Sequence, residues 1–337
     1  MAEKTNTLPQ TKGAFKLRGI VTGMSRPEAY SSKAAKSGRD MHTLSFGVQT
    51  SKNNIQYVRM SGVALDMAKF TKYNNATKKN DAEQVPWKKR NEFKKEGYTP
   101  QFGIVVSLDK DGKSKRSLFS YDACAALATE LTDGMSVFIT GTIDVSSRDE
   151  KDNDGNPVTR SYTTCIPTGI YATKTDVDFE AADFEEENTF KQRIVFMGAE
   201  KDDDDYVINA KIVKYGDVVE NIRFYCAQKL WSGLKANLKP YHSIDVVGRL
   251  ESVVSAEAQE DDEKSEQWFD TEDTTVKHFE RIQPRRKRLT ITNADKASWR
   301  KDEYSKETIE KTQQAKEDFG GDGSDWGADD GDAPWED

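Results

Sequence analysis

The chain has 337 residues, enough for two domains and a tail, and its 35% hydrophobic and 32% charged content is typical of a soluble globular protein. No apolar run approaches the roughly 18 residues of a membrane-spanning helix, and residues 1–13 lack the apolar core of a signal peptide, so neither a membrane protein nor a secreted one is expected. The net charge of −8 divides unevenly, because residues 318–337 hold eight acidic and no basic side chains whereas residues 1–174 hold 27 basic and 18 acidic ones. A basic first half with an acidic tail predicts a polyanionic partner.

In chain order, residues 1–12 are predicted to be disordered, and a first domain is predicted over residues 13–175. Alternating apolar residues indicate a strand at 15–24, a long polar loop follows at 25–40, and a hairpin spans 41–50 and 55–62. Residues 64–116 form an insertion, with a further strand pair predicted near its end. A helix at 121–131 and strands at 134–145 and 158–171 complete the domain.

Residues 176–187 carry seven acidic and no basic side chains and are predicted to link the domains. The second domain spans 188–293, with strands at 190–198, 205–214 and 217–226, a helix at 230–238, and strands at 241–254 and 276–292. Residues 294–316 are predicted to be a charged linker, helical in part. The Gly- and Asp-rich residues 317–337 are predicted to be a disordered acidic tail.

The two domains repeat one pattern. Residues 107 positions apart match without a gap over the helix and the strand that follows it, as Leu127, Leu131, Ser136, Val137, Ile139, Gly141 and Ile143 with Leu234, Leu238, Ser243, Ile244, Val246, Gly248 and Leu250. The first strands match at an offset of 175, with Phe15 on Phe190, and the hairpins match more loosely at 164. One unit is therefore built twice.

Strand, long loop, hairpin, helix, strand, strand is the order of an OB-fold, a five-stranded Greek-key barrel. The predicted fold class is mainly all-β, with two OB-fold-like five-stranded Greek-key barrels, the first carrying the large insertion, and a disordered acidic tail. An SH3-like barrel is the alternative, although it rarely places a helix between the third and fourth strands.

Opposite the apolar face of each domain, the first three strands present cations and aromatic rings. Cations neutralise phosphates and aromatic rings stack on bases, so these residues are candidates for a nucleic-acid surface. In the order of the chain they are Lys16, Arg18, Tyr57, Arg59, Lys191, Arg193, Lys211, Arg223 and Tyr225. An ordinary solvated strand face is the alternative interpretation.

Three further segments carry candidates. The densest part of the insertion interleaves aromatic and basic residues, which predict either a small satellite core with a lysine surface or a flap over a bound strand; the candidate contacts are Trp87, Lys88, Lys89, Arg90, Phe93 and Lys94. Arg285 and Arg286 lie at the start of the last strand, where they would add positive charge to the predicted nucleic-acid surface. The tail is predicted to bind partner proteins through its acidic and aromatic residues, Asp325, Trp326, Asp329, Asp330 and Trp335.

Other chemistry is not predicted. The three histidines are far apart, no cysteine pair has metal-ligand spacing, and no phosphate-binding or nucleophile motif occurs, so we expect no metal, no cofactor and no enzyme. Scattered Cys124, Cys165 and Cys226 predict reduced thiols in the cytoplasm, with Cys124 and Cys226 as small buried hydrophobes.

Tandem barrels, a basic and aromatic surface and an acidic tail with terminal aromatic residues resemble the single-stranded DNA-binding proteins of replication, most of all those of bacteriophages. The resemblance implies a sequence-tolerant protein that coats and protects single-stranded DNA in replication, recombination and repair. It also implies that the protein recruits replication or recombination proteins through its tail. If the chain is phage-encoded, the protein is expected in the cytoplasm of the bacterial host. It is expected to be a monomer or a dimer.

Two alternatives remain open. The first is an RNA-binding or strand-annealing recombination protein on the same fold, because stacking and phosphate contacts serve either polymer. The second is a structural or interaction protein, such as a virion component, in which the predicted surface binds no nucleic acid.

Overall fold

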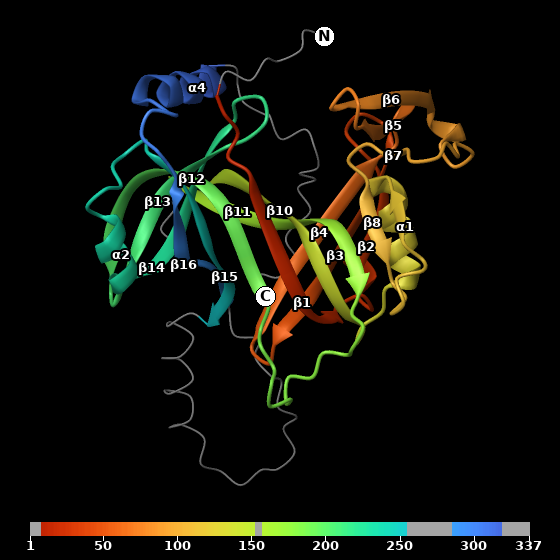
Figure 1. Cartoon of the computed structure of the whole chain (residues 1–337), viewed down its shortest axis with the longest axis horizontal. Helices are drawn as coiled ribbons and strands as arrows, with labels where there is room; N and C mark the ends of the chain where they lie inside the picture. Colours follow the sequence, from red (N-terminus) through yellow and green to blue (C-terminus); the bar gives the residue numbers. More distant parts are fainter. Residues whose placement is uncertain (1–7, 152–156, 255–284, 319–337) are drawn as a thin grey trace.

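The computed structural model describes residues 8–151, 157–254 and 285–318. Its strands form two closed barrels that lie side by side, with a small sheet attached to the first (Figure 1).

Barrel 1 consists of β1 (Gly13–Thr22), β3 (Asp40–Ser51), β4 (Asn54–Val63), β10 (Ser136–Lys151) and β11 (Pro157–Ala172). β1 pairs with β3 and β10, β3 with β4, and β10 with β11, all antiparallel, and a parallel contact between β4 and β11 closes the barrel. Helix α1 (Ser120–Glu130) precedes β10 and buries Ala123, Cys124 and Leu127 along one side. This strand order and the helix position are those of an OB-fold.

Barrel 2 repeats this arrangement with β12 (Asn188–Asp202), β13 (Asp205–Val213), β14 (Val219–Ala227), β15 (Ser243–Val254) and β16 (Arg285–Arg300). β12 pairs with β13 and β15, β13 with β14 and β15 with β16, and a parallel contact between β14 and β16 closes it. Helix α2 (Gln228–Leu234) lies between β14 and β15. The predicted fold of two OB-fold-like barrels is confirmed.

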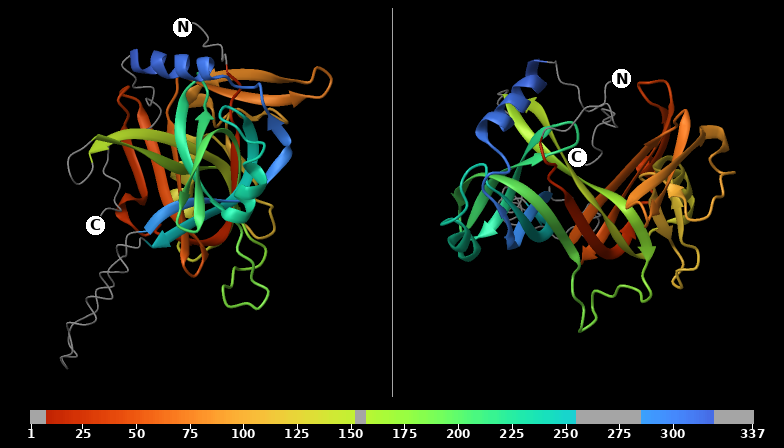
Figure 2. Two further views of the ribbon diagram at one scale, coloured as in Figure 1. Left: turned by 90° about the vertical axis from the view of Figure 1, so that its left-hand side faces the viewer. Right: turned by 45° about the horizontal axis from the view of Figure 1, so that its top comes forward.

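Three segments differ from the prediction. The loop at 25–40 contains a short 3-10 helix (Pro27–Ala29) and β2 (Tyr30–Ala34), a polar strand at the sheet edge whose one partner among the described strands is β3. The last strand runs on to Arg300, past the predicted domain end at 293, and α4 (Lys306–Asp318) follows it on the outside of barrel 2 (Figure 2). Residues 8–12 are packed rather than disordered, since Leu8 and Thr11 are buried against barrel 2.

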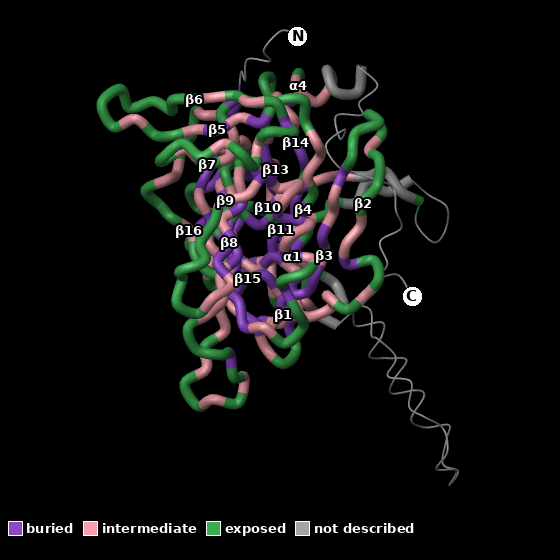
Figure 3. The backbone as a smooth tube through the Cα atoms, turned by 90° about the vertical axis from the view of Figure 1, so that its right-hand side faces the viewer, coloured by how far each residue is buried: buried purple, intermediate pink, exposed green. Residues whose placement is uncertain are grey.

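The insertion forms two parts. β5 (Met67–Asn74), β6 (Lys79–Pro86) and β7 (Thr99–Pro100) make a separate three-stranded sheet, with a 3-10 turn at Trp87–Lys89. β8 (Ile104–Ser107) and β9 (Arg116–Leu118) pair with each other, and β8 also pairs with β11. The insertion is therefore joined to barrel 1 by a strand pairing as well as by the chain. The tube of β6 carries the exposed colour over much of its length (Figure 3).

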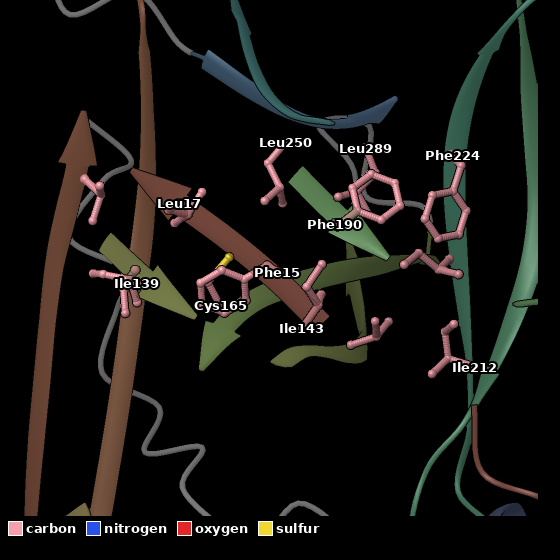
Figure 4. Close-up of a cluster of buried hydrophobic side chains, with 14 of the residues drawn as sticks. Phe15, Leu17, Ile139, Ile143, Cys165, Phe190, Ile212, Phe224, Leu250 and Leu289 are labelled. Atoms are coloured by element: carbon pink, nitrogen blue, oxygen red, sulfur yellow. The ribbon is translucent and has the colours of Figure 1, made fainter. Parts of the chain in front are cut away.

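The barrels are joined through β1 and β12, which pair antiparallel with Phe15 opposite Phe190. These two residues occupy the same place in the sequence repeat, so an approximate two-fold axis passes between them. Side chains from both barrels pack in one continuous core around this junction (Figure 4).

All three cysteines are buried and free within the described part of the chain. Burial raises the pKa of the Cys124 thiol to about 12 and that of the Cys226 thiol to about 11. The prediction that Cys124 and Cys226 act as small buried hydrophobes is confirmed.

Candidate nucleic-acid interface

The outer face of each hairpin presents one arginine at the same place. Arg59 on β4 lies opposite Ser45, and Arg223 on β14 lies opposite Asn209. Both arginines are exposed, and neither makes an ion pair with another residue that the structure describes. Because their neighbours on the inward side of each strand fill the barrel cores, the alternation of the strand holds both guanidinium groups outward.

An aromatic ring accompanies each arginine on its strand. Tyr57 is half-buried, and the ammonium group of Lys287 lies 5.4 Å from its ring centroid. Tyr225 is also half-buried, and the guanidinium of Arg288 lies 4.1 Å from its ring centroid and is ion-paired to Asp205. β16 of barrel 2 therefore places one cation over the aromatic ring of each hairpin, Lys287 over Tyr57 of barrel 1 and Arg288 over Tyr225 of barrel 2.

Lys16, Arg18 and Lys191 lie on a different surface from these arginines. The first half of β1, Gly13 to Leu17, pairs with β12, and only Ile20 to Thr22 reach β3. Lys16 and Lys191 are both exposed and face outward where the barrels join, with Lys191 3.1 Å from the carboxylate of Asp245. The single surface predicted from the sequence for each barrel is thus divided into a hairpin face and a junction face.

Arg193 is engaged inside the protein. Its guanidinium donates to Asp245 at 2.9 Å, to Ser243 at 3.0 Å and to Glu303 at 2.5 Å. Burial opposes its charge, but the hydrogen bonds to Glu303 and Asp245 raise the pKa of Arg193 above its ordinary value. A guanidinium with two carboxylates bound to it adds little to the attraction of a phosphate, so we remove Arg193 from the candidate contacts.

Lys211 is covered by α4. Its ammonium group donates to Gln313 at 3.0 Å and to Asn221 at 3.1 Å. Burial lowers the pKa of Lys211, against the opposing effect of Glu310. Lys211 is also removed from the candidate contacts.

The cover over this part of barrel 2 is apolar. Val195, Val213 and Val219 stand at outward positions of β12, β13 and β14, and they are buried beneath Tyr304 and Ile309, with Leu8 from the N-terminal segment in the same cluster. The sequence carried a signal for this. Residues 194–196 are Ile-Val-Phe, a continuous apolar run, which indicates a strand buried on both sides.

The insertion uses most of its aromatic residues as a small core. Trp87 is buried with Phe70 and Phe119, Phe93 stacks on Phe70 at 4.3 Å, and Tyr98 packs on Phe93. The predicted satellite core is confirmed. Trp87 and Phe93 cannot offer a free ring face to a base, so both are removed from the candidate contacts.

Arg90 fastens this core to α1. It binds both carboxylate oxygens of Asp122 at 2.9 and 2.7 Å, and its guanidinium lies 4.3 Å from the Trp87 ring centroid. Arg90 therefore has a structural role within the protein. Lys88, Lys89 and Lys94 are exposed on the same segment and remain candidates.

The remaining predicted residues are placed only in part. Arg285 and Arg286 open β16, where their backbones pair with Val254 and Val253. The tail candidates Asp325, Trp326, Asp329, Asp330 and Trp335 lie outside the described residues.

One aromatic pair was missed by sequence reasoning. Phe138 on β10 lies between Arg18 on β1 and Tyr171 on β11 in one cross-strand row, and the two rings are 6.5 Å apart. Both side chains are half-buried. The available signal was their position, because each is a large aromatic residue at an outward position of its strand.

No group of three or more His, Cys, Asp or Glu side chains comes together among the described residues in a way that could hold a metal ion. No described helix is both long enough and apolar enough to span a membrane.

Comparison with solved structures gives distant neighbours. The wild-type single-stranded DNA binding protein from Thermus aquaticus is 9% identical, with a TM-score of 0.38, over 85% of this chain and 93% of that one. A deletion mutant of the same Thermus protein is 8% identical, with a TM-score of 0.38, over 85% of this chain and 94% of that one. A Plasmodium falciparum SSB in complex with ssDNA is 9% identical, with a TM-score of 0.17, over 48% and 89%.

These TM-scores are too low to define the fold, which is therefore assigned from the strand pairing of the chain itself. No curated protein sequence matches the chain. A family model, YorF, matches residues 12–322, which include both barrels, the insertion, α4 and the end of the N-terminal segment. The chain therefore belongs to the YorF family.

Proposed function

We propose that this protein binds single-stranded DNA with little sequence preference. The observation that carries the proposal is the repeated outward arginine, Arg59 in barrel 1 and Arg223 in barrel 2, each exposed and without an ion pair among the described residues. Each arginine pairs across its hairpin with a small polar residue, Ser45 or Asn209, so the surface around the cation is open.

The chemistry of this surface suits a flexible polyanion. OB barrels bind oligonucleotides across the outer face of the second and third barrel strands, which here are β3 with β4 and β13 with β14. Guanidinium groups neutralise phosphates without reading base edges, and aromatic rings such as Tyr57 and Tyr225 accept any base. The proposed contacts are Lys16, Arg18, Tyr57, Arg59, Lys88, Lys89, Lys94, Lys191, Arg223, Tyr225, Arg285 and Arg286.

We further propose that the protein coats and protects single strands during replication and recombination. The acidic tail, with Trp326 and Trp335, would recruit partner proteins, because its charge is opposite to that of a basic docking surface and its two indole rings offer apolar anchors.

The test is a fluorescence titration with oligo(dT), reading intrinsic Trp and Tyr at two salt concentrations. We expect strong quenching, an affinity that falls steeply with salt, and weak binding to duplex DNA. A variant without residues 318–337 should bind as well or better, since a segment of the same charge sign as DNA is removed. An oligo(rU) titration in parallel separates DNA binding from RNA binding.

The double variant Arg59→Ala/Arg223→Ala tests the surface itself. Each lost phosphate contact should reduce the slope of log K against log salt by about 0.7 on a single strand, so the slope should fall by about 1.4. The matched control is Lys110→Ala/Lys306→Ala, which removes two exposed lysines that are paired to Asp176 and Glu310. An unchanged slope in the arginine variant would show that the hairpin face does not contact the phosphates. No binding at low salt, even without the tail, would favour the structural protein.

A further inference from the structure

Phe102 is the most exposed of the large hydrophobic residues that the structure describes, with 89% of its surface accessible. Of the other aromatic residues of the insertion, Phe70, Trp87, Phe93 and Tyr98 pack together in its core, whereas Tyr73 is exposed. Phe102 and Tyr73 stand outside this core, and Phe102 is the more exposed of the two. An exposed phenylalanine of this kind contributes no burial to the folded state.

The backbone at Phe102 is also unfavourable. Its φ is +56°, in the left-handed region, and it occupies the third position of a turn that the Gly103 amide closes by donating to the Pro100 carbonyl at 3.1 Å. Glycine or asparagine is the usual residue at a turn position with positive φ, because a β-carbon is crowded there. Of the five described non-glycine residues with positive φ, Phe102 is the one with a fully exposed apolar side chain.

The turn is held rigidly from both sides. The Gln101 amide donates to the Lys69 carbonyl at 2.8 Å, and Pro100 pairs with Phe70 on β5. On the other side, a β-carbon at Gly103 would lie 2.7 Å from the Ser117 hydroxyl, so the chain passes tightly against β9 before entering β8. The ring of Phe102 is therefore presented to solvent by a fixed turn between β7 and β8.

The basic charge of the insertion that carries this ring favours a nucleobase over an apolar protein pocket. Residues 64–116 hold thirteen basic and seven acidic side chains, and Lys88, Lys89 and Lys94 are exposed there. A protein-docking site requires several contiguous apolar residues. An exposed ring on a cationic module matches the alternation of base and phosphate along a single strand, where a ring stacks on a base and lysines contact phosphates.

We infer that Phe102 stacks on a base of bound single-stranded nucleic acid and extends the path of the strand from barrel 1 onto the insertion. This inference rests on the proposed function. Phe102 would take the base-stacking role that the sequence predicted for Trp87 and Phe93, whose rings pack in the core of the insertion.

The experiment compares Phe102→Ala with the wild-type protein, using oligo(dT) and an abasic oligonucleotide of the same length. Phe102→Ala should lower the affinity for oligo(dT) about ten-fold. It should have little effect on the abasic strand, which has no base to stack. Phe102→Trp should keep the affinity, and its added fluorescence should be quenched on binding. The matched control is Tyr215→Ala, which removes another exposed aromatic residue, 70% accessible, from a turn of barrel 2.

Folding is checked with Phe102→Asn, since asparagine tolerates positive φ. Its Tm should equal or exceed that of the wild type, while its affinity falls as in Phe102→Ala. If the wild type binds and Phe102→Ala binds equally well, the inference is overturned while the proposed function stands. An equal loss on abasic and normal strands would also overturn it, because the ring would then act on something other than a base. Failure of the wild type to bind would reject the proposed function before any variant is compared.

Discussion

Each barrel contains one phenylalanine–glycine contact at the same place in the repeat. Phe15 pairs across the strands with Gly141, and Phe190 pairs with Gly248 in the same way. A β-carbon at either glycine would lie 2.6 Å from the facing ring and 2.1 Å from a carbonyl oxygen, of Ile166 in barrel 1 and of Thr290 in barrel 2. The ring therefore occupies the space that a side chain would take, which explains why the repeat has Phe and Gly at matched positions.

Gly141→Ala and Gly248→Ala should each destabilise the protein by about 3 kcal/mol or more, because the added methyl group meets backbone that cannot move aside. The free energy of unfolding in urea measures this. The matched control is Gly198→Ala, since a β-carbon there meets nothing within 4 Å. A small effect at both Gly141 and Gly248 would show that the strands separate to admit the methyl group.

The pairing of strands also shows how much of the fold the sequence could predict. The offsets read from the sequence, 175, 164 and 107, each join residues that are paired equivalently in both barrels, as Ser45 with Arg59 and Asn209 with Arg223. Hydrophobic alternation depends on local sequence, so the strands and their outward residues were predictable. The engagement of Arg193 by Glu303 was not, because 110 positions separate them and no local pattern links a strand to a distant loop.

At the scale of elements, α4 and the N-terminal segment form a cover over one side of barrel 2. Tyr304 joins them, since its hydroxyl donates to the Pro9 carbonyl at 2.7 Å and its ring lies with Ile309 in the apolar cluster. The equivalent region of barrel 1 carries half-exposed Ile20 and Ile55 with no such helix among the described residues. The two barrels therefore differ in how much of the outer face remains open to a ligand, although their strands are arranged alike.

Burial raises the pKa of Tyr304 to about 12, above its ordinary value of 10. The neutral hydroxyl is thus favoured in the folded state, and its contribution is present below pH 10 and lost as the pH rises from 10 toward 12. Tyr304→Phe should lower the free energy of unfolding by about 1 kcal/mol at neutral pH through the lost hydrogen bond. The difference from the wild type should shrink between pH 10 and 12.

Unfolding in urea at pH 7 and pH 11 measures this difference. The buried thiols titrate in the same alkaline range, but they are present in both proteins and cancel. Tyr215→Phe, at an exposed side chain, is the control and should change neither value. A difference in the free energy of unfolding between Tyr304→Phe and the wild type that stays constant with pH would contradict the raised pKa of Tyr304.

At the scale of the whole molecule, the two barrels share one apolar core. Besides the β1–β12 pairing, a polar cluster joins them at the junction, where the Glu186 carboxylate accepts hydrogen bonds from Thr50 at 2.6 Å and from Asn54 and Asn188 at 2.9 Å. Asn54 and Asn188 also donate to the Leu250 carbonyl of barrel 2. The predicted acidic linker at 176–187 is therefore fixed at its end, and this junction holds the outer faces of the two barrels in one orientation.

Such a junction predicts that both barrels unfold together. Trp87 lies beside barrel 1 and Trp231 and Trp299 pack against the core in barrel 2, so fluorescence and calorimetry should report one transition, because neither barrel can expose its junction strand without losing the shared core. Glu186→Ala should lower the free energy of unfolding by about 2 kcal/mol, since it leaves three buried or half-buried donors short of an acceptor. Glu185→Ala, at an exposed neighbour, should change it little. Two separate transitions in the wild type would mean that the barrels fold independently, and the path of a bound strand across the junction would then be hinged.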